Sequence, residues 1–223
     1  MARRAVNYQL SQNNPAMHHL IRSGSTGNAI LYHGSILVDI GVPYALIKEF
    51  QSQIQLVLLT HQHLDHINLK TLKKLCAERP TLRVGACEWM RDKVKELRNV
   101  DIYEIGKLYD YGQFKISPFK LYHDVPNCGY RIFKENTRIF HATDTAHLKG
   151  ITAKEYDLYA IEHNYNEELA LKAIEQAERE GKFCHFKGSI NSHLSEEQAK
   201  DFIFNNKAEH SQVLRLHETK SYL

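Results

Sequence analysis

Four side chains that commonly bind metal ions stand within six residues of the chain: His61, His63, Asp65 and His66 of the segment THQHLDH. In an extended chain His61 and His63 point to the same side, so they can share one metal. Asp65 and His66 lie past the turn and can reach a second metal. Without a cation, groups of this kind would repel one another or be desolvated. The segment therefore predicts a centre of two divalent metals, which is suited to hydrolysis.

One loop cannot fill two metal shells, because a catalytic zinc usually takes three protein ligands and keeps one position open for water. Further ligands must come from other strand ends, where a sheet presents its functional edge. The candidates are His123 and Asp144, each at or just after a predicted strand, His217 at the end of the last strand, and His193 before a predicted helix. A structural role is the alternative for each of them.

The elements that must position these residues follow from hydrophobic periodicity and from turn and capping signals. Predicted strands cover residues 29–33, 35–40, 55–60, 112–123, 129–133, 137–141, 157–162 and 212–217. Predicted helices cover residues 43–50, 68–79, 87–98, 166–180 and 195–205. Gly34 joins the first two strands in a hairpin, Asn68 and Ser195 are N-caps, and Gly181 is a C-cap. This pattern predicts one mixed α/β layered domain over residues 1–223.

The composition is that of an ordinary globular chain, with 43% hydrophobic and 25% charged residues in a length of 223. No apolar run could cross a bilayer and no apolar stretch follows the basic N-terminal residues, so we predict a cytoplasmic protein without a membrane partner. Cys76, Cys87, Cys128 and Cys184 form no CxxC pair, which indicates free thiols rather than a cysteine-rich zinc site. The net charge of +3 is compatible with a nucleic-acid substrate but does not favour one.

The segments SGSTGN, ILVDIG, LLTHQHLDHI, YHDVPNCGY, FHATDT and SHLSEEQA resemble, in this order, the metallo-β-lactamase fold hydrolases, whose signature is HxHxDH. Within that superfamily the chain looks most like the WalJ-type (YycJ-type) branch, regarded as DNA exonucleases. The SGSxGN start, the TDT segment and the HLS segment before a helix carry this similarity. The resemblance implies a four-layer αββα sandwich with the metals at one edge of the sheets.

The resemblance also implies a ligand set. It assigns His61, His63 and His123 to the first metal and Asp65, His66 and His217 to the second, with Asp144 bridging both. Either His193 or His217 could be the last ligand, and we prefer His217 because it ends a strand. His193 would then contact the scissile phosphate, like the histidine before a helix in ribonuclease Z relatives.

We therefore predict a hydrolase in which two cations hold a hydroxide between them and lower the pKa of that water toward neutrality. Asp65 and His193 are its predicted catalytic residues. Asp39 is a candidate acceptor for the N–H of a ligand histidine, with strand termination as the alternative. Glu162 could lie near the site or on the surface. Zinc suits a His/Asp site, and manganese competes because two aspartates add oxygen ligands.

Three classes of function fit these residues. A phosphodiesterase, in particular a DNA nuclease, is favoured because the helix start after the HLS segment is a ready anion site. A hydrolase of a thioester, a lactone or a cyclic phosphodiester is the alternative. A non-catalytic module is disfavoured because every ligand position is filled. A nuclease of this size would bind its nucleic-acid strand on the surface of the single domain. A homodimer could extend that surface.

Overall fold

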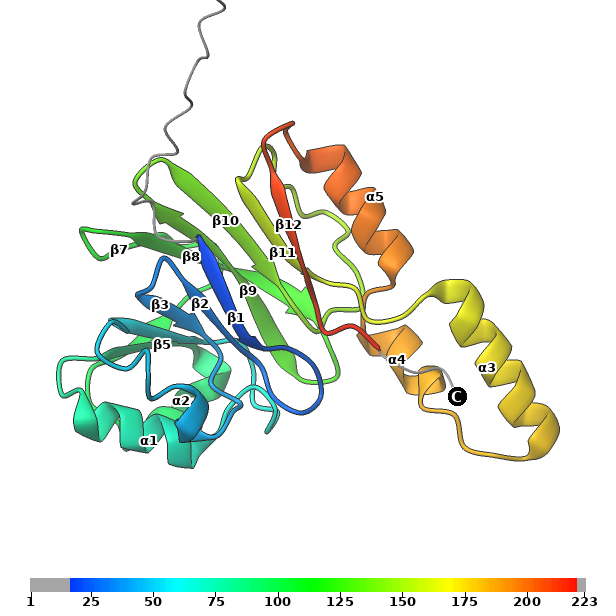
Figure 1. Cartoon of the computed structure of the whole chain (residues 1–223), viewed down its shortest axis with the longest axis horizontal. Coiled ribbons are helices and arrows are strands. Elements are labelled where there is room, and N and C mark those ends of the chain that lie inside the picture. The colour runs from blue at the N-terminus through cyan, green and yellow to red at the C-terminus, as the bar shows by residue number, and fades with distance from the viewer. Residues whose placement is uncertain (1–16, 220–223) are drawn as a thin grey trace, which may run out of the picture.

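The computed structural model describes residues 17–219, so residues 1–16, from which we predicted the absence of a targeting signal, lie outside the described part of the chain. Two six-stranded sheets lie face to face, with helices on their outer surfaces (Figure 1). No helix within residues 17–219 is both long and apolar enough to cross a membrane.

The first sheet holds, in spatial order, β1 (His18–Arg22), β2 (Ala29–Tyr32), β3 (Ile36–Val38), β4 (Leu56–Leu59), β5 (Arg83–Cys87) and β6 (Val100–Tyr103). The second holds β12 (Gln212–Leu216), β11 (Leu158–Glu162), β10 (Thr137–Ala142), β9 (Pro126–Lys134), β8 (Lys115–Tyr122) and β7 (Tyr109–Asp110). The helices are α1 (Leu69–Glu78), α2 (Arg91–Val94), α3 (Glu167–Glu180), α4 (Phe186–Ser192) and α5 (Glu196–Asn206), with 3₁₀ turns η1 (Tyr44–Leu46) and η2 (Glu88–Met90). Both sheets combine antiparallel and parallel pairs.

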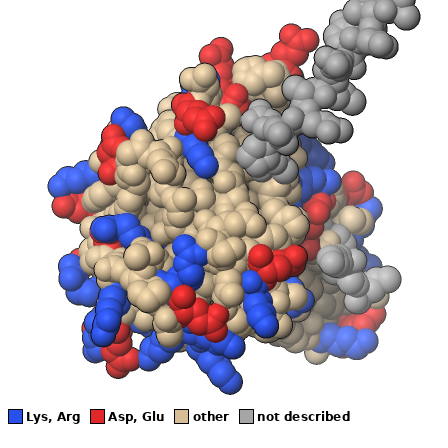
Figure 2. Space-filling model, turned by 60° about the vertical axis from the view of Figure 1, so that its left-hand side comes forward, with Lys and Arg blue, Asp and Glu red and all other residues tan. Residues whose placement is uncertain are grey.

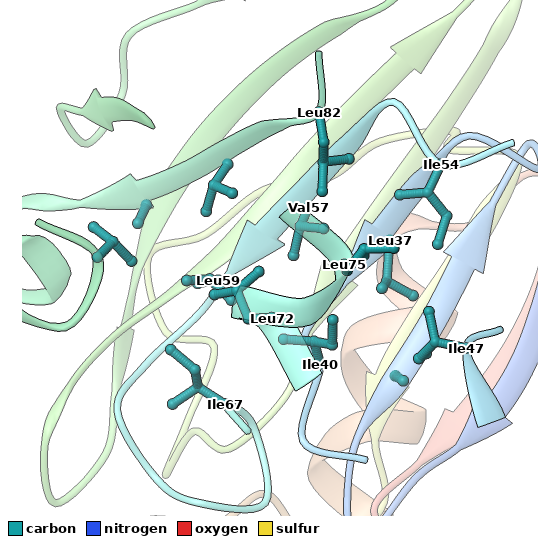
Figure 3. Close-up of a cluster of buried hydrophobic side chains, with 14 of the residues drawn as sticks. Leu37, Ile40, Ile47, Ile54, Val57, Leu59, Ile67, Leu72, Leu75 and Leu82 are labelled. Atoms are coloured by element: carbon teal, nitrogen blue, oxygen red, sulfur yellow. The ribbon is translucent and has the colours of Figure 1, made fainter. Parts of the chain in front are cut away.

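Strand β4 is buried on both faces, which explains its unbroken apolar sequence. Val57 and Leu59 pack outward with Leu72 of α1 (Figure 3). Leu56 and Leu58 belong to the cluster between the two sheets. The strand that leads into THQHLDH is thus held from both sides.

The second sheet is covered in the same way. Phe140 and Tyr159 pack outward against Ala199 and Ile203 of α5. The layers therefore follow the order helix, sheet, sheet, helix, and the predicted αββα sandwich is confirmed. The predicted hairpin is also present: β2 and β3 pair antiparallel around a turn of residues 33–35, in which Gly34 has a φ of 66°.

Helices α3 and α4 form a hairpin beyond the edge of the sandwich (Figure 1). Its small core consists of Tyr165, Ala170, Cys184 and Phe186. The sequence did not predict α4, because FKGSINS contains Gly and Ser and is helical only where it packs on α3. The helix ends at Ser192, and His193 follows it into the site.

The helix predicted at residues 87–98 is present only in part, at residues 88–94. Cys87 is buried and extended at the end of β5, and only η2 and the short α2 follow it. Asn99, with a φ of 54°, returns the chain to β6. The need to pair β6 with β5 overrides the local helical pattern. The helix predicted at residues 43–50 is likewise reduced to the 3₁₀ turn η1.

Candidate metal centre

Strand β4 delivers THQHLDH to the edge of the first sheet. The loop then folds back, because the amides of His66 and Ile67 donate to the His63 carbonyl at 2.9 and 3.0 Å. The Ile40 amide donates to the His66 carbonyl at 3.0 Å, which ties the loop to the chain after β3. Backbone hydrogen bonds thus fix the loop before any metal binds.

Gly41 approaches this loop so closely that a β-carbon there would lie 1.8 Å from the Asp65 carbonyl oxygen. We expect Gly41→Ala to displace the loop, to lower metal content and to reduce the free energy of unfolding by roughly 1–3 kcal/mol. Thermal unfolding and elemental analysis measure both effects. Gly188→Ala, where a β-carbon meets nothing within 4 Å, is the matched control. Unchanged metal content in Gly41→Ala would contradict the prediction.

His61, His63 and His123 form the first group of candidate ligands. The Nε2 of His61 lies 3.2 Å from the Nδ1 of His63, which lies 3.4 Å from the Nε2 of His123. The outer nitrogen of His61 contacts the Thr60 hydroxyl at 3.0 Å, and that of His123 donates to the Ser192 carbonyl at 2.8 Å. Burial lowers the pKa of His61 to about 2, so its ring is neutral and can bind a cation.

The second group contains Asp65, His66, Asp144 and His217. The Nε2 of His66 lies 2.7 Å from Oδ2 of Asp144 and 3.5 Å from Oδ2 of Asp65. The Nε2 of His217 lies 3.7 Å from Oδ1 of Asp144 and 3.8 Å from Oδ2 of Asp65. Two carboxylates and two imidazoles therefore converge on one position.

Asp144 joins the two groups, since its Oδ2 also lies 3.4 Å from the Nε2 of His61. Burial would raise the pKa of Asp144, but the charges of His66 and His217 outweigh it and hold the pKa well below its ordinary value. The backbone of Asp144 is left-handed, with a φ of 54°. The Asn127 amide stabilises this conformation by donating to the Asp144 carbonyl at 2.7 Å. Strain of this kind is common where a side chain must be aimed precisely.

Asp39 lies behind His66. Its Oδ2 is 2.6 Å from the Nδ1 of His66, and its Oδ1 accepts from the Thr60 amide at 2.9 Å. The structure thus brings Asp39 to the outer nitrogen of a candidate ligand. A carboxylate in this place fixes the orientation of the imidazole and makes it a better ligand.

We expect Asp39→Asn to weaken metal binding at the second position by about 10- to 100-fold, because outer carboxylates contribute this much to affinity. Titration with zinc against a competing chelator measures the change. Asp110→Asn, on the exposed residue that ends β7, is the control. Equal zinc affinities of Asp39→Asn and the wild-type protein would show that Asp39 only terminates the strand and does not support the ligand His66.

His193 stands beside the second group and contacts Glu162. Its Nδ1 lies 2.5 Å from Oε1 of Glu162 and 3.7 Å from Oδ1 of Asp144. Glu162 is fully buried, and its other oxygen accepts from the amides of Thr145 and Leu194. Burial would lower the pKa of His193, but the hydrogen bond and charge of Glu162 outweigh it and raise the pKa. His193 is therefore held in a form that can donate a proton.

The sequence left His193 and His217 as alternatives for the last ligand. The Nε2 of His217 faces Asp65 and Asp144, whereas the Nδ1 of His193 is engaged by Glu162. Both histidines also lie in a third candidate group, with Asp144 and Glu162. The atoms that face Asp65 and Asp144 favour His217 as the ligand of the second group.

Sequence reasoning missed Asn28 and left Glu162 undecided. The Oδ1 of Asn28 accepts from the Gly24 amide at 2.8 Å, which directs its Nδ2 toward Oδ2 of Asp65 at 3.3 Å. The SGSTGN segment, which entered the sequence analysis only as part of the family resemblance, therefore orients a candidate ligand. The signal that could have identified Asn28 is its place at the end of SGSTGN, one of the segments that carry the family resemblance.

The donor atoms fit divalent metal ions. The first group offers three nitrogens, and the second offers two nitrogens and two carboxylates. Asp144 is 2% exposed, and a buried carboxylate among imidazoles is stabilised by a cation. Three nitrogens suit zinc, and the added oxygens of the second group also suit manganese.

A cavity of about 440 Å³ opens beside the centre, with His193 and His217 among its lining residues. One wall is the loop of residues 23–26 after β1, and the other includes Ser189 of α4. The cavity therefore borders the second group of candidate ligands through His217.

Comparisons with known proteins identify the family and the fold. A family model described as "Beta-lactamase superfamily domain" matches residues 40–199. No curated protein was found to match the chain. The chain is similar in structure to the metallo-beta-lactamase fold protein YhfI from Bacillus subtilis (TM-score 0.68, 16% identity, 90% of this chain and 85% of that one). It is also similar to the short form of human tRNase Z (TM-score 0.67, 16% identity, 92% and 93%). Zn²⁺-bound PqqB from Methylobacterium extorquens is a further match (TM-score 0.59, 14% identity, 86% and 77%).

Proposed function

The chain belongs to the beta-lactamase superfamily, and from this premise we propose that it is a metal-dependent hydrolase that cleaves phosphodiesters. The observation that carries the proposal is the contact between His193 and Glu162 beside the second ligand group. An alkoxide leaves phosphorus readily only when a positioned acid protonates it. A thiolate that leaves a thioester needs no such acid, so this pair favours a substrate with an alkoxide leaving group, and among these we propose a phosphodiester.

The groups of the chain then have separate tasks. Two bound cations would lower the pKa of a water toward neutrality and so supply the nucleophile. Asp65 is placed to accept the proton of that water, since it belongs to the second group of candidate ligands. Burial would raise the pKa of Asp65, but the neighbouring His217 and His66 outweigh it and lower the pKa, which favours the ionised carboxylate.

Asp144 would hold both cations, since its Oδ2 lies near the Nε2 atoms of His61 and His66. His193 contacts the phosphate and protonates the leaving oxygen, while Glu162 stabilises the charged ring.

Most amides at the start of α5 are already engaged, which weakens the anion site that the sequence suggested. The amide of Glu196 donates to the Tyr165 carbonyl at 2.8 Å, and that of Gln198 donates to the Ser195 hydroxyl at 3.0 Å. The Leu194 amide donates to Glu162. These donors are engaged by the protein itself, so the preference for phosphate rests on His193 instead.

We propose a nucleic acid as the substrate, with DNA first because the sequence resembles the WalJ-type branch. The name of human tRNase Z, which shares the fold, denotes cleavage of tRNA and supports testing RNA beside DNA. Zinc is the proposed metal and manganese its competitor. Zinc in PqqB supports this choice.

A small or cyclic phosphodiester is the second candidate. Among the described residues that line the cavity, none is Lys or Arg, and Glu218 is acidic. Exposed lysines and arginines are often paired, as in the contact between Lys73 and Glu96. Figure 2 shows basic and acidic side chains side by side on one face of the molecule. Such a surface favours a short substrate over a long polyanion.

The test compares three substrates with zinc or manganese added: end-labelled DNA, the same sequence as RNA, and bis(p-nitrophenyl) phosphate. Metal-dependent release of p-nitrophenolate with no cleavage of either polymer would select the small phosphodiester. Cleavage of a labelled strand would select the nuclease, and its products would give the polarity. The double variant His61→Ala/Asp65→Ala is the control. A metal-loaded protein inactive on all three substrates would refute the proposal.

A further inference from the structure

The candidate ligands of the first metal position come from both sheets. His61 and His63 follow β4 of the first sheet, whereas His123 follows β8 of the second. The side chains packed between the sheets are mostly apolar. Hydrophobic contact is non-directional, so it does not by itself fix how the edges of the two sheets lie against each other. A directional bond between the sheets at this edge would fix the spacing of the three imidazoles.

Tyr130 of β9 makes such a bond. Its side chain is fully buried in the cluster between the sheets, and its hydroxyl donates to the Leu59 carbonyl at 2.5 Å. Leu59 ends β4 and stands two residues before His61. Strand β9 in turn pairs with β8, which leads to His123. The bond therefore joins the strand end that carries two of the ligands to the sheet that carries the third.

Two further side chains hold the next peptide. The Nε1 of Trp89, in η2, donates to the Thr60 carbonyl at 3.3 Å. The Cys128 thiol, also on β9, lies 3.6 Å from the same oxygen and is a weak donor. The Thr60 carbonyl belongs to the peptide bond with His61, so these contacts hold the backbone from which that ligand extends.

We propose that Tyr130 is a positioning residue for the first metal position, assisted by Trp89. The Tyr130 hydroxyl holds the end of β4 against the second sheet, so that His61 faces His123 before a cation binds. Preorganisation of the ligands in this way raises metal affinity without adding a ligand. The proposal rests on the metal centre and is independent of the substrate.

Zinc affinity tests the proposal. Tyr130→Phe keeps the ring and removes the hydroxyl, and it is titrated with Zn²⁺ against a competing chelator beside the control Tyr159→Phe. The control loses the same kind of bond on the outer side of the second sheet, where the buried Tyr159 hydroxyl donates to the Ala153 carbonyl at 2.6 Å. We expect one of the two zinc-binding steps to weaken at least about tenfold in Tyr130→Phe and neither step to weaken in the control.

Melting temperatures separate positioning from stability alone, because each of these two variants loses a buried hydrogen bond. If Tyr130→Phe melts at a lower temperature, as the control does, but binds zinc like the wild-type protein, the bond only stabilises the fold and the proposal is wrong.

A double-mutant cycle assigns the effect to one metal position. His123 belongs to the first ligand group only, so His123→Ala removes a ligand of the first position and leaves the second group complete. We expect Tyr130→Phe to weaken zinc binding no further in the His123→Ala background. A further tenfold loss there would show that Tyr130 does not act through the first position.

Trp89→Phe is a second variant, on a half-buried residue. It removes the N–H that donates to the Thr60 carbonyl, and we expect the same zinc step to weaken to a smaller extent. If Tyr130→Phe does not fold, unchanged zinc affinity in Trp89→Phe overturns the proposal. A wild-type protein that binds no zinc would instead refute the metal centre itself, so the two failures are distinguishable.

Discussion

Asparagine in place of Asp144 is expected to lower hydrolysis by at least about 10²–10³-fold, the usual loss when one preorganised group is removed from a site. The change keeps the shape of the side chain but removes its charge and one donor oxygen. The Oδ2 of Asp144 lies within 3.4 Å of the Nε2 atoms of both His61 and His66, so one substitution affects both metal positions. No other described carboxylate contacts both groups as closely.

Turnover of bis(p-nitrophenyl) phosphate and the number of bound metals measure the effect together. We expect Asp144→Asn to bind fewer than two metals under conditions that load the wild-type protein fully. Asp201→Asn, on the exposed surface of α5, controls for the loss of a carboxylate. Full loading with near-wild-type turnover would show that Asp144 does not bridge the metals.

The grouping of the candidate ligands could be predicted from the sequence because each of these residues follows a strand. THQHLDH carries its own evidence in its spacing, and His123, Asp144 and His217 follow β8, β10 and β12. Parallel strands carry their carboxyl ends to one edge of a sheet, so β10 and β12 had to bring Asp144 and His217 together. The residue types and their positions at strand ends were therefore enough to predict which side chains come together.

The residues that contact and orient these side chains, Glu162 and Asn28, could not be predicted in the same way. Glu162 ends β11, and a residue at a strand end can point into the site or to the solvent with equal ease. Its burial follows from the register of β11 with β12 and from the position of α4, which sets His193 against it. Asn28 depends on the path of a glycine-containing loop, which apolar periodicity does not encode.

The elements predicted best are those with a recognisable local pattern, such as an apolar run or a helix cap. The apolar run of β4 is buried on both faces, and the capping box at Ser195 starts α5 as expected. Strand β1, HHLIR, lies at the edge of its sheet and is only partly buried, so its sequence has no apolar alternation. Strands β5 and β6 depend on pairing with distant segments, which local patterns do not show.

Replacement of His193 by asparagine is expected to reduce cleavage of a phosphodiester with an alkoxide leaving group by about 10²–10⁴-fold, the usual contribution of a general acid. The amide can still donate a hydrogen bond to phosphate but cannot transfer a proton. Glu162→Gln should show the same pattern to a smaller extent, because the ring remains but loses the charge that raises its pKa. His210→Asn is the matched control, since His210 also faces a carboxylate, that of Asp157, but is 61% exposed.

The leaving group separates proton donation from binding. A p-nitrophenolate departs without a proton, so His193→Asn should lose far less activity on bis(p-nitrophenyl) phosphate than on a dinucleotide. The comparison is made within one enzyme preparation, so partial metal loss reduces both rates alike and cancels in their ratio. If the ratio of the rate on bis(p-nitrophenyl) phosphate to the rate on the dinucleotide is higher in His193→Asn than in the wild-type protein, His193 is the acid. Equal losses on both substrates would mean that His193 holds the phosphate or a metal, and the preference for phosphodiesters would then lose its main support.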